Sequence, residues 1–240
     1  MPLPFFYVEE TITTGTIVLS EETSKHIVQV LRMQQGEQLQ LTNGKGNLLL
    51  CKIIDNNRKK CLVEIIQFTF INPADIPVCI GISLIKNNTR FEWFLEKATE
   101  IGISAIVPLI CERTEKQQFK QERMQNIVVS AMLQSEQVWL PVLYQPQKLN
   151  TFIAANPYKS RYIAHCQTET NKVQLIHQPA STSKSKLILI GPEGDFTKAE
   201  ILFAQQEHFV PVALGNTRLR TETAGIVAGT ILINKSLPTQ

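Results

Sequence analysis

The chain has 240 residues, of which 43% are hydrophobic and 19% charged, a composition that excludes wholesale disorder because a core can be buried. Its length suits one large domain or two modest ones. The formal net charge of +3 permits contact with phosphate groups but does not require it.

The amino-terminal part of the chain is predicted to form a compact β-barrel with one short helix. Alternating or β-branched apolar residues predict strands at Phe6–Glu9, Thr16–Leu19, Glu37–Thr42, Gly46–Ile54 and Lys60–Phe68. The dipeptide Asn43-Gly44 is a strong hairpin signal. Ser20 can cap the helix, and its expected buried stripe is Ile27, Val30 and Leu31.

A predicted linker follows at Ile71–Pro77, where two prolines remove backbone donors and disfavour a helix. It divides the chain into a first domain at residues 1–72 and a second at residues 78–240.

The second domain is predicted to be a parallel α/β sheet with helices on both sides, because apolar strands alternate with helical patterns. Asn88 or Thr89 can cap the first helix, and Gly102 stands where it should end. The tract Ser181–Lys186 is predicted to be a surface loop. Strands are expected at Val78–Ile85, Ser104–Leu109, Tyr162–His165, Leu187–Ile190 and Pro211–Leu214; helices are expected around Met124–Met132, at Lys198–His208 and at Ala224–Asn234.

Three segments that follow predicted strands are candidates for chemistry, because ligands of parallel sheets bind beyond the carboxyl ends of strands. Gly191–Thr197 is either a glycine-rich ligand loop or a tight turn with Thr197 as a helix cap. Leu214–Ala224 brings two arginines and a glutamate to a helix start, with Thr221 as a candidate cap, which favours an anionic partner over surface ion pairs. Tyr162–Glu169 carries His165, for which a structural role is favoured over a catalytic one.

Other classes of site are not indicated by the sequence. The five cysteines are scattered, with no C-x-x-C pair, so we expect no disulfide framework and no metal, and interpret all five as small buried hydrophobes. Phosphate-binding, dinucleotide-binding, nucleophile-elbow and zinc-helix motifs do not occur. With no secretory signal and no run of eighteen apolar residues, we expect a soluble cytoplasmic protein without a membrane segment.

In combination, these segments resemble a known family. Gly191-Pro192-Glu193-Gly194, Leu214-Gly215 and Leu219-Arg220-Thr221-Glu222-Thr223-Ala224 are similar to motifs of the RsmE family, the 16S ribosomal RNA (uridine-N3)-methyltransferases of the SPOUT superfamily. The resemblance extends to Val30-Leu31-Arg32, Gly36 and Gly44-Lys45-Gly46 in the first domain. It also covers Lys97–Gly102, Pro108 and Glu112-Arg113-Thr114 in the second.

The resemblance implies a PUA-like β-barrel that binds RNA, followed by a SPOUT methyltransferase domain with a carboxy-terminal trefoil knot. It implies S-adenosylmethionine as the cofactor, a homodimer, and one uridine in the decoding region of 16S rRNA as the target, on the small ribosomal subunit. The implied cofactor-binding residues are His165, Cys166, Ile190, Gly191, Pro192, Glu193, Gly194, Leu214, Gly215, Leu219, Arg220, Thr223 and Ala224.

Within this family resemblance, Arg220 is the candidate to stabilise charge on the uracil oxygens, and Glu222 to orient it or accept the N3 proton. Candidate RNA contacts are Lys25, His26, Arg32, Lys45 and Arg218.

The chain departs from the family pattern at several positions. Asp195 stands where many members have a second glycine, Leu133 where many have glutamate, and Gln137 where many have arginine; Leu3-Pro4 replace an arginine before the first strand. Two other functions stay open: a knotted methyltransferase acting on tRNA, and a non-enzymatic RNA-binding module.

Overall fold

The computed structural model describes residues 3–115, 118–167, 172–179 and 185–236; Thr168, Glu169 and residues 181–184 of the expected surface loop lie outside them. The chain forms two compact units. The first comprises residues up to Pro73 together with Met132–Leu140, and the second comprises Ala74–Ala131 and the chain from Pro141 onward. The domain division between residues 72 and 78 stays a prediction, and it did not include Met132–Leu140 in the first domain.

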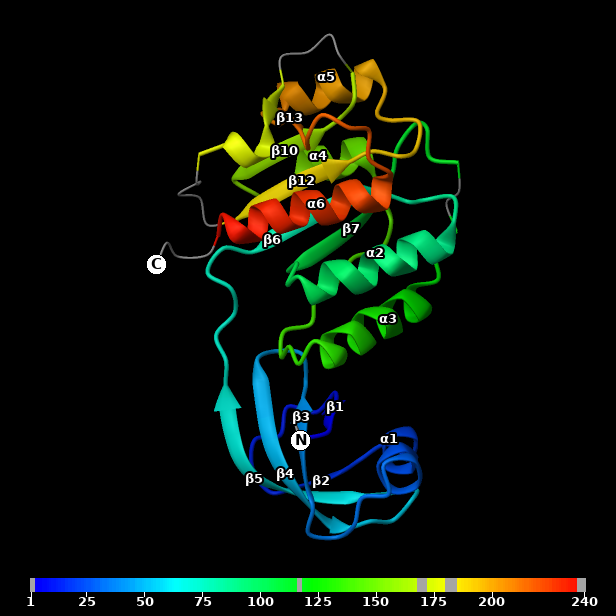
Figure 1. The fold of residues 1–240 in the computed structure, drawn as a ribbon, viewed down its shortest axis with the longest axis vertical. Coiled ribbons are helices and arrows are strands. Elements are labelled where there is room, and N and C mark those ends of the chain that lie inside the picture. Colours follow the sequence, from blue (N-terminus) through cyan, green and yellow to red (C-terminus); the bar gives the residue numbers. More distant parts are fainter. Residues whose placement is uncertain (1–2, 116–117, 168–171, 180–184, 237–240) are drawn as a thin grey trace. The chain divides into compact units, whose positions relative to one another are not determined.

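The first unit is built on a five-stranded sheet in the order β1-β3-β4-β5-β2 (Figure 1). Its strands are β1 (Phe5–Tyr7), β2 (Thr16–Val18), β3 (Gln38–Thr42), β4 (Asn47–Asp55) and β5 (Leu62–Phe70). β1 runs parallel to β3, and the other neighbours are antiparallel. Apolar side chains from β3, β4 and β5 fill one core, as the alternating pattern predicted.

The short helix of the first unit differs from the prediction. Ser20 caps α1 (Glu21–Lys25) as expected, since its Oγ accepts from the Thr23 N–H. The chain then continues as the π-helix η1 (His26–Val30), in which Leu31 N–H donates to His26 O. Ile27 is fully buried, but Val30 and Leu31 are 66% and 42% exposed, so the predicted stripe was wrong for both. Hydrogen bonds to the fifth preceding residue change the helical phase, which carries these two side chains out of register with Ile27.

Met132–Leu140 completes the first unit through contacts that are distant in sequence. The Trp139 Nε1–H donates to Ile71 O at 2.9 Å, and the indole meets the Phe70 ring edge-on. Leu140 N–H donates to Gly44 O at 2.8 Å. Gly44 has a φ of +67° and lies close to Leu140, which explains why the predicted hairpin position is a glycine.

The second unit is a parallel sheet in the order β11-β13-β10-β12-β6-β7-β8, with β9 also paired to β7. All of the pairings among the described strands are parallel, as predicted. The strands are β6 (Val78–Ser83), β7 (Ala105–Ile110), β8 (Val142–Leu143), β9 (Gln147–Lys148), β10 (Ser160–Ala164), β11 (Val173–Gln174), β12 (Lys186–Ile190) and β13 (Val210–Ala213).

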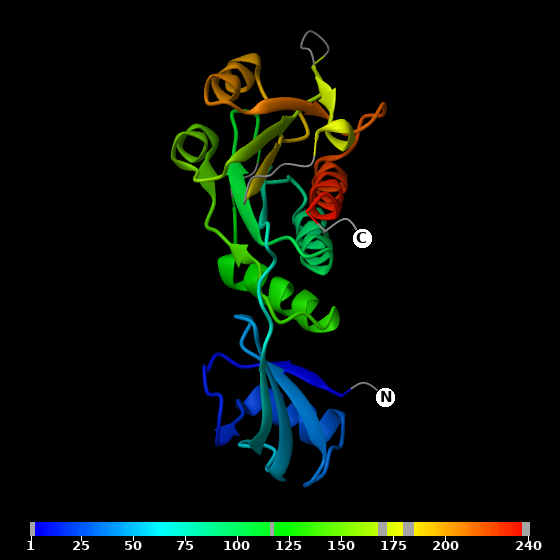
Figure 2. The same ribbon diagram turned by 90° about the vertical axis from the view of Figure 1, so that its left-hand side faces the viewer.

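Helices cover both faces of this sheet (Figure 2). α4 (Leu149–Ala155) and α5 (Lys198–Gln206) pack on one face, where Phe152 and Ile201 join the core formed by Leu187 and Leu189. α2 (Asn88–Glu100) and α6 (Thr221–Asn234) pack against each other on the opposite face. The remaining helices are α3 (Gln121–Gln134) and the short η2 (Leu175–His177). No helix in the described ranges has the length and apolarity needed to cross a membrane.

Several local predictions for the second unit need correction. Asn87, rather than Asn88 or Thr89, caps α2, because its side chain accepts from the Thr89 N–H. The last helix begins at Thr221 instead of Ala224, and the Thr221 hydroxyl bonds outside its own helix instead of capping it. The short elements β8, β9, α4, β11 and η2 were not predicted.

Lys186, expected in a surface loop, is a buried residue of β12 with 1% exposure. Its Nζ donates to Leu232 O and, at 2.7 Å, to Ser236 Oγ at the end of α6. Burial, together with the nearby Lys235 charge, lowers the pKa of this ammonium. A lysine at this position therefore binds a carbonyl in the last turn of a neighbouring helix.

Candidate functional site

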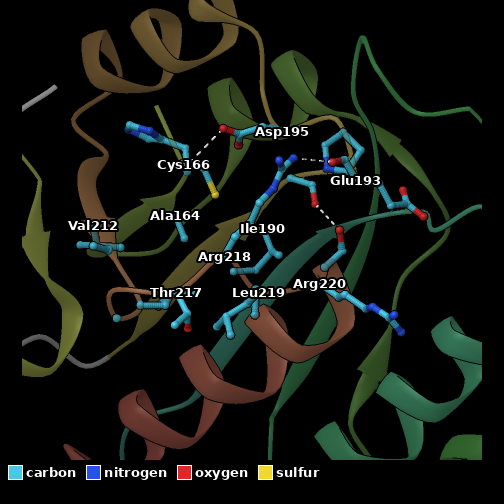
Figure 3. Close-up of a pocket in the computed structure, with 18 of the residues that line it drawn as sticks. Ala164, Cys166, Ile190, Glu193, Asp195, Val212, Thr217, Arg218, Leu219 and Arg220 are labelled. Carbon is cyan, nitrogen blue, oxygen red and sulfur yellow. Dashed lines mark hydrogen bonds between the residues drawn. The ribbon is translucent and has the colours of Figure 1, made fainter. Parts of the chain in front are cut away.

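A cavity of about 830 Å³ opens at the carboxyl ends of β10, β12 and β13. The sheet register places Ala164 beside both Ile190 and Val212, so these three strands end at the same level. The loops that follow them converge there, together with the start of α6 (Figure 3). This is the edge at which parallel sheets bind ligands.

Most of the site residues expected from the sequence line this cavity. Those that do are His165, Cys166, Ile190, Gly191, Pro192, Glu193, Leu214, Gly215, Arg218, Leu219, Arg220 and Ala224. Gly194, Glu222 and Thr223 are not among the lining residues. Ala164, Asp195, Asn216, Thr217 and Thr221 also line the cavity and belong to the three candidate segments, whereas the sequence had not indicated Arg90, Lys172, Val212 and Ala213 as part of the wall.

The loop after β12 is held by hydrogen bonds to its backbone carbonyls. The Thr221 hydroxyl donates to Gly191 O at 3.0 Å, which joins this loop to the first turn of α6. Arg113 donates to Gly194 O at 2.7 Å, and Arg218 donates to Glu193 O at 3.3 Å. Arg218 therefore contacts the protein backbone here, in addition to any RNA contact.

Gly191 is needed for close packing at this turn. A Cβ at this residue would lie 3.1 Å from both the ring and the backbone nitrogen of Phe196. The capping prediction for the next helix is confirmed, because Thr197 and Glu200 form a reciprocal capping box at the start of α5. The loop is therefore both a close-packed turn and one wall of the cavity.

His165 lies at the end of β10 and is 6% exposed. Burial lowers the pKa of this imidazole, the Lys172 charge lowers it further, and Asp195 opposes both effects. The Lys172 ammonium also donates to His165 O at 3.0 Å. These surroundings favour a neutral ring on the cavity wall.

The cysteines divide into two groups. Burial raises the pKa of Cys51, Cys79 and Cys111 to about 12, and Cys61 is also buried, as expected of small hydrophobic side chains. Cys166 is exposed and lines the cavity, so the interpretation of all five as buried was wrong for this residue.

Glu222, on the first turn of α6, is 6% exposed, and its Oε1 lies 3.7 Å from Arg90 Nε on α2. Its Oε2 is buried without a hydrogen-bond partner among the described residues. Arg220 is exposed at the amino-terminal cap of the same helix and lines the cavity. Nothing near Arg90 in the sequence signals its part in the site, because the pairing depends on the packing of α2 against α6.

The other candidate RNA contacts belong to the first unit. Lys25 pairs with Glu21 at 2.8 Å, and the His26 ring packs edge-on against Phe6. Arg32 has a φ of +56° and is exposed, as is Lys45 in the β3–β4 turn. Within the described ranges, no group of three or more His, Cys, Asp or Glu side chains could hold a metal ion.

The fold and the cavity are those of an RNA methyltransferase. A family model described as an RNA methyltransferase domain matches residues 72–233, and one described as an RNA methyltransferase PUA domain matches residues 19–66. The chain belongs to the RsmE family, whose members are named ribosomal RNA small subunit methyltransferase E.

Relatives and solved structures agree with this assignment. The Synechocystis ribosomal RNA small subunit methyltransferase E is 32% identical over 91% of this chain and 73% of its own length. A crystal structure of a probable rRNA-methyltransferase from Porphyromonas gingivalis has a TM-score of 0.87 and 34% identity, covering 95% of each chain. The Neisseria gonorrhoeae methyltransferase E, bound to S-adenosyl methionine, has a TM-score of 0.85 and 27% identity, also covering 95% of each.

Proposed function

We propose that this protein transfers a methyl group from S-adenosylmethionine to N3 of one uridine in the decoding region of 16S rRNA. The observation that carries the proposal is the cavity where the loops after β10, β12 and β13 converge, within the region matched by the RNA methyltransferase family model. A full-length structural relative carries S-adenosyl methionine, which supports the choice of cofactor.

The chemistry of the cavity wall fits this cofactor. The volume of about 830 Å³ is at the upper end of the range for small-ligand sites. Ile190, Val212 and Leu219 offer apolar surface to the adenosine part of the cofactor, while Glu193 offers a carboxylate to the cationic groups of S-adenosylmethionine. When bound, S-adenosylmethionine supplies an activated methyl group on a sulfonium. The predicted binding residues Gly194 and Thr223 adjoin this wall in sequence.

Arg220 is the proposed charge-stabilising residue. Loss of the N3 proton leaves negative charge on the uracil carbonyl oxygens, and an exposed guanidinium on the cavity wall can donate hydrogen bonds to them. The protein's main contribution is alignment, because the wall residues hold the reacting groups in place.

Glu222 is the proposed proton acceptor or orienting residue. Its Oε2 is buried without a hydrogen-bond partner among the described residues, so this oxygen retains the capacity to accept one. The pairing with Arg90 through Oε1 holds the carboxylate at the start of α6, close in sequence to Arg220.

We further propose that the first unit binds rRNA through Lys25, His26, Arg32 and Lys45, and that Arg218 contacts RNA at the cavity. The protein is proposed to act as a homodimer in the cytoplasm, with its carboxy-terminal segment threaded as a trefoil knot around the cofactor loops. The hydrogen bond between the Thr221 side chain and Gly191 O, which joins two of these loops, supports their close association.

The test is transfer of a labelled methyl group from S-adenosylmethionine to small subunits lacking the modification, with naked 16S RNA and modified subunits alongside. We expect label as 3-methyluridine at one decoding-region site, and none on modified subunits. If the protein binds the cofactor but transfers the methyl group only to tRNA, then tRNA and not 16S rRNA is its substrate. No cofactor binding would leave an RNA-binding module and contradict the proposal.

A further inference from the structure

Asp195 occupies an unfavourable backbone conformation on the cavity wall. Its φ is +63°, in the left-handed region that non-glycine residues rarely adopt. Arg32, Glu136 and His208 share this feature among the described non-glycine residues, but only Asp195 of these lines the cavity. We therefore expect another interaction to offset the conformational cost of an aspartate at this position.

The compensating interaction is a pair of hydrogen bonds to the carboxylate. Asp195 Oδ1 accepts from the Phe196 N–H at 2.9 Å, which stabilises the turn itself. Asp195 Oδ2 accepts from the Cys166 N–H at 2.9 Å, across the cavity wall (Figure 3). Hydrogen bonds from a backbone N–H to an ionised carboxylate are stronger than neutral ones.

The second of these bonds joins two separate loops. Cys166 belongs to the loop that follows β10, and Asp195 belongs to the loop that follows β12. β10 and β12 are paired as far as Ala164 and Ile190, and beyond those residues the strand ladder no longer connects the two segments. The carboxylate thus continues the connection past the end of the sheet, where both loops form the cavity wall.

We propose that Asp195 is a positioning residue that ties the loop after β10 to the loop after β12 and so preforms the cofactor cavity. The inference rests on the proposed function, because it takes S-adenosylmethionine as the ligand. A cavity whose wall is already ordered binds its ligand more tightly, since less conformational entropy is lost on binding. A glycine at this position would adopt the backbone conformation freely but would leave the Cys166 amide without its acceptor, with the 3.1 Å hydrogen bond from Gln167 Nε2 to Phe196 O remaining between the loops.

The experiment compares Asp195→Gly with His208→Gly in the full-length protein. His208 has the same φ of +63°, is exposed after α5, and does not line the cavity, so it controls for the release of backbone strain. Hydrogen exchange of the Cys166 amide is measured by NMR without ligand, and S-adenosylmethionine affinity by calorimetry.

For Asp195→Gly we expect Cys166 exchange about tenfold faster and a Kd for S-adenosylmethionine about tenfold higher, because the charge-assisted hydrogen bond to the Cys166 amide is lost. His208→Gly should change neither the Cys166 exchange rate nor the Kd. Asp195→Asn, whose single acceptor oxygen can serve only one of the two amides, should fall between Asp195→Gly and the wild type.

Unchanged Cys166 exchange in Asp195→Gly would overturn the inference, whatever happens to the affinity, because the loops would then be joined by other contacts. Faster exchange with an unchanged Kd would also overturn it, because preforming the cavity would then have no effect on binding. Failure of the proposed function is recognised separately. The wild-type protein would then not bind S-adenosylmethionine, while the exchange measurement would still report on the connection between the loops.

Discussion

The Thr221 hydroxyl donates a 3.0 Å hydrogen bond to the carbonyl oxygen of Gly191. Thr221 is the first residue of α6 and Gly191 is the first residue after β12, so the bond joins the two chain segments that bound the cavity on either side. Thr221 is 5% exposed, which shields the bond from water. Removal of the hydroxyl would leave a buried carbonyl without this donor.

Thr221→Val should therefore destabilise the protein by about 1–3 kcal/mol, the cost of an unsatisfied buried polar group. Thermal unfolding measures the effect. Thr230→Val is the matched control on the same helix, because the Thr230 hydroxyl is exposed and donates only to Ile226 O within its own helix. Equal melting temperatures for the two variants would show that the Thr221–Gly191 bond adds no stability.

Gly225 of α6 lies against the ring of Phe94 on α2. A Cβ at this residue would come within 2.5 Å of Phe94 Cε2 and 3.2 Å of Ile82 Cδ1. We expect Gly225→Ala to destabilise the protein by about 1–3 kcal/mol through overpacking, despite the higher helix propensity of alanine.

Gly229→Ala introduces the same methyl group on the same helix with less severe contacts, so it serves as the comparison for Gly225→Ala. Its nearest neighbours, at 3.0 to 3.2 Å, are the terminal methyl groups of Ile80, Ile101 and Ile103, which can move more easily than a ring. Chemical denaturation should show a smaller loss of stability for this variant than for Gly225→Ala. The reverse order would contradict the close contact between Gly225 of α6 and the Phe94 ring of α2.

Arg220→Ala should lower methyl transfer by about 100-fold or more if the guanidinium stabilises charge on the uracil. The Kd for S-adenosylmethionine should change far less than the turnover, because the lost interaction forms mainly in the transition state. Arg123→Ala is the control, since this exposed arginine pairs with Glu92 and does not line the cavity. A variant that keeps full turnover while binding cofactor would remove Arg220 from the mechanism.

His165 should make the stability of the protein depend on pH. Its pKa is lowered in the folded state, chiefly by burial, so the folded protein resists protonation more than the unfolded chain does. The stability from the neutral ring is fully present above the unfolded pKa of about 6.5 and is lost as the pH falls through the lower folded value.

Thermal unfolding of the wild type and His165→Gln from pH 7.5 downward tests this dependence. The melting temperature of the wild type should fall more steeply below about pH 6.5 than that of the variant. His177→Gln replaces an exposed histidine and should keep the wild-type slope. Parallel curves for wild type and His165→Gln would show that His165 does not titrate as its burial implies.

Much of the fold was predictable because its strands carry strong local patterns. Val78–Ser83 is buried at every position, and the sequence shows it as one apolar run. The stripe around Ile27 was wrong because residues 26–30 form a π-helix, which the 3.6-residue pattern cannot distinguish from an α-helix. The attachment of Met132–Leu140 to the first unit was missed because it depends on contacts such as Trp139 with Ile71, which no local signal reports.

The candidate site was predictable where short motifs follow strands. The glycine-rich loop after β12 and the segment before α6 were both identified from sequence, and both line the cavity. Arg90 and Lys172 were missed because packing, and not a motif, brings them there. Asp195 was noted as a departure from the family pattern within the loop after β12, but its bond to Cys166 was not predicted, since that bond depends on the position of another loop.

The buried Lys186 and Thr221 together connect α6 to both ends of β12. At one end of β12, the Lys186 ammonium donates to Leu232 O in the last turn of α6; just past the other end, Gly191 O accepts from Thr221, the first residue of that helix. A strand and a helix that are hydrogen-bonded to each other at both ends resist sliding along each other. β12 and α6 should therefore move together as one rigid unit beside the cavity.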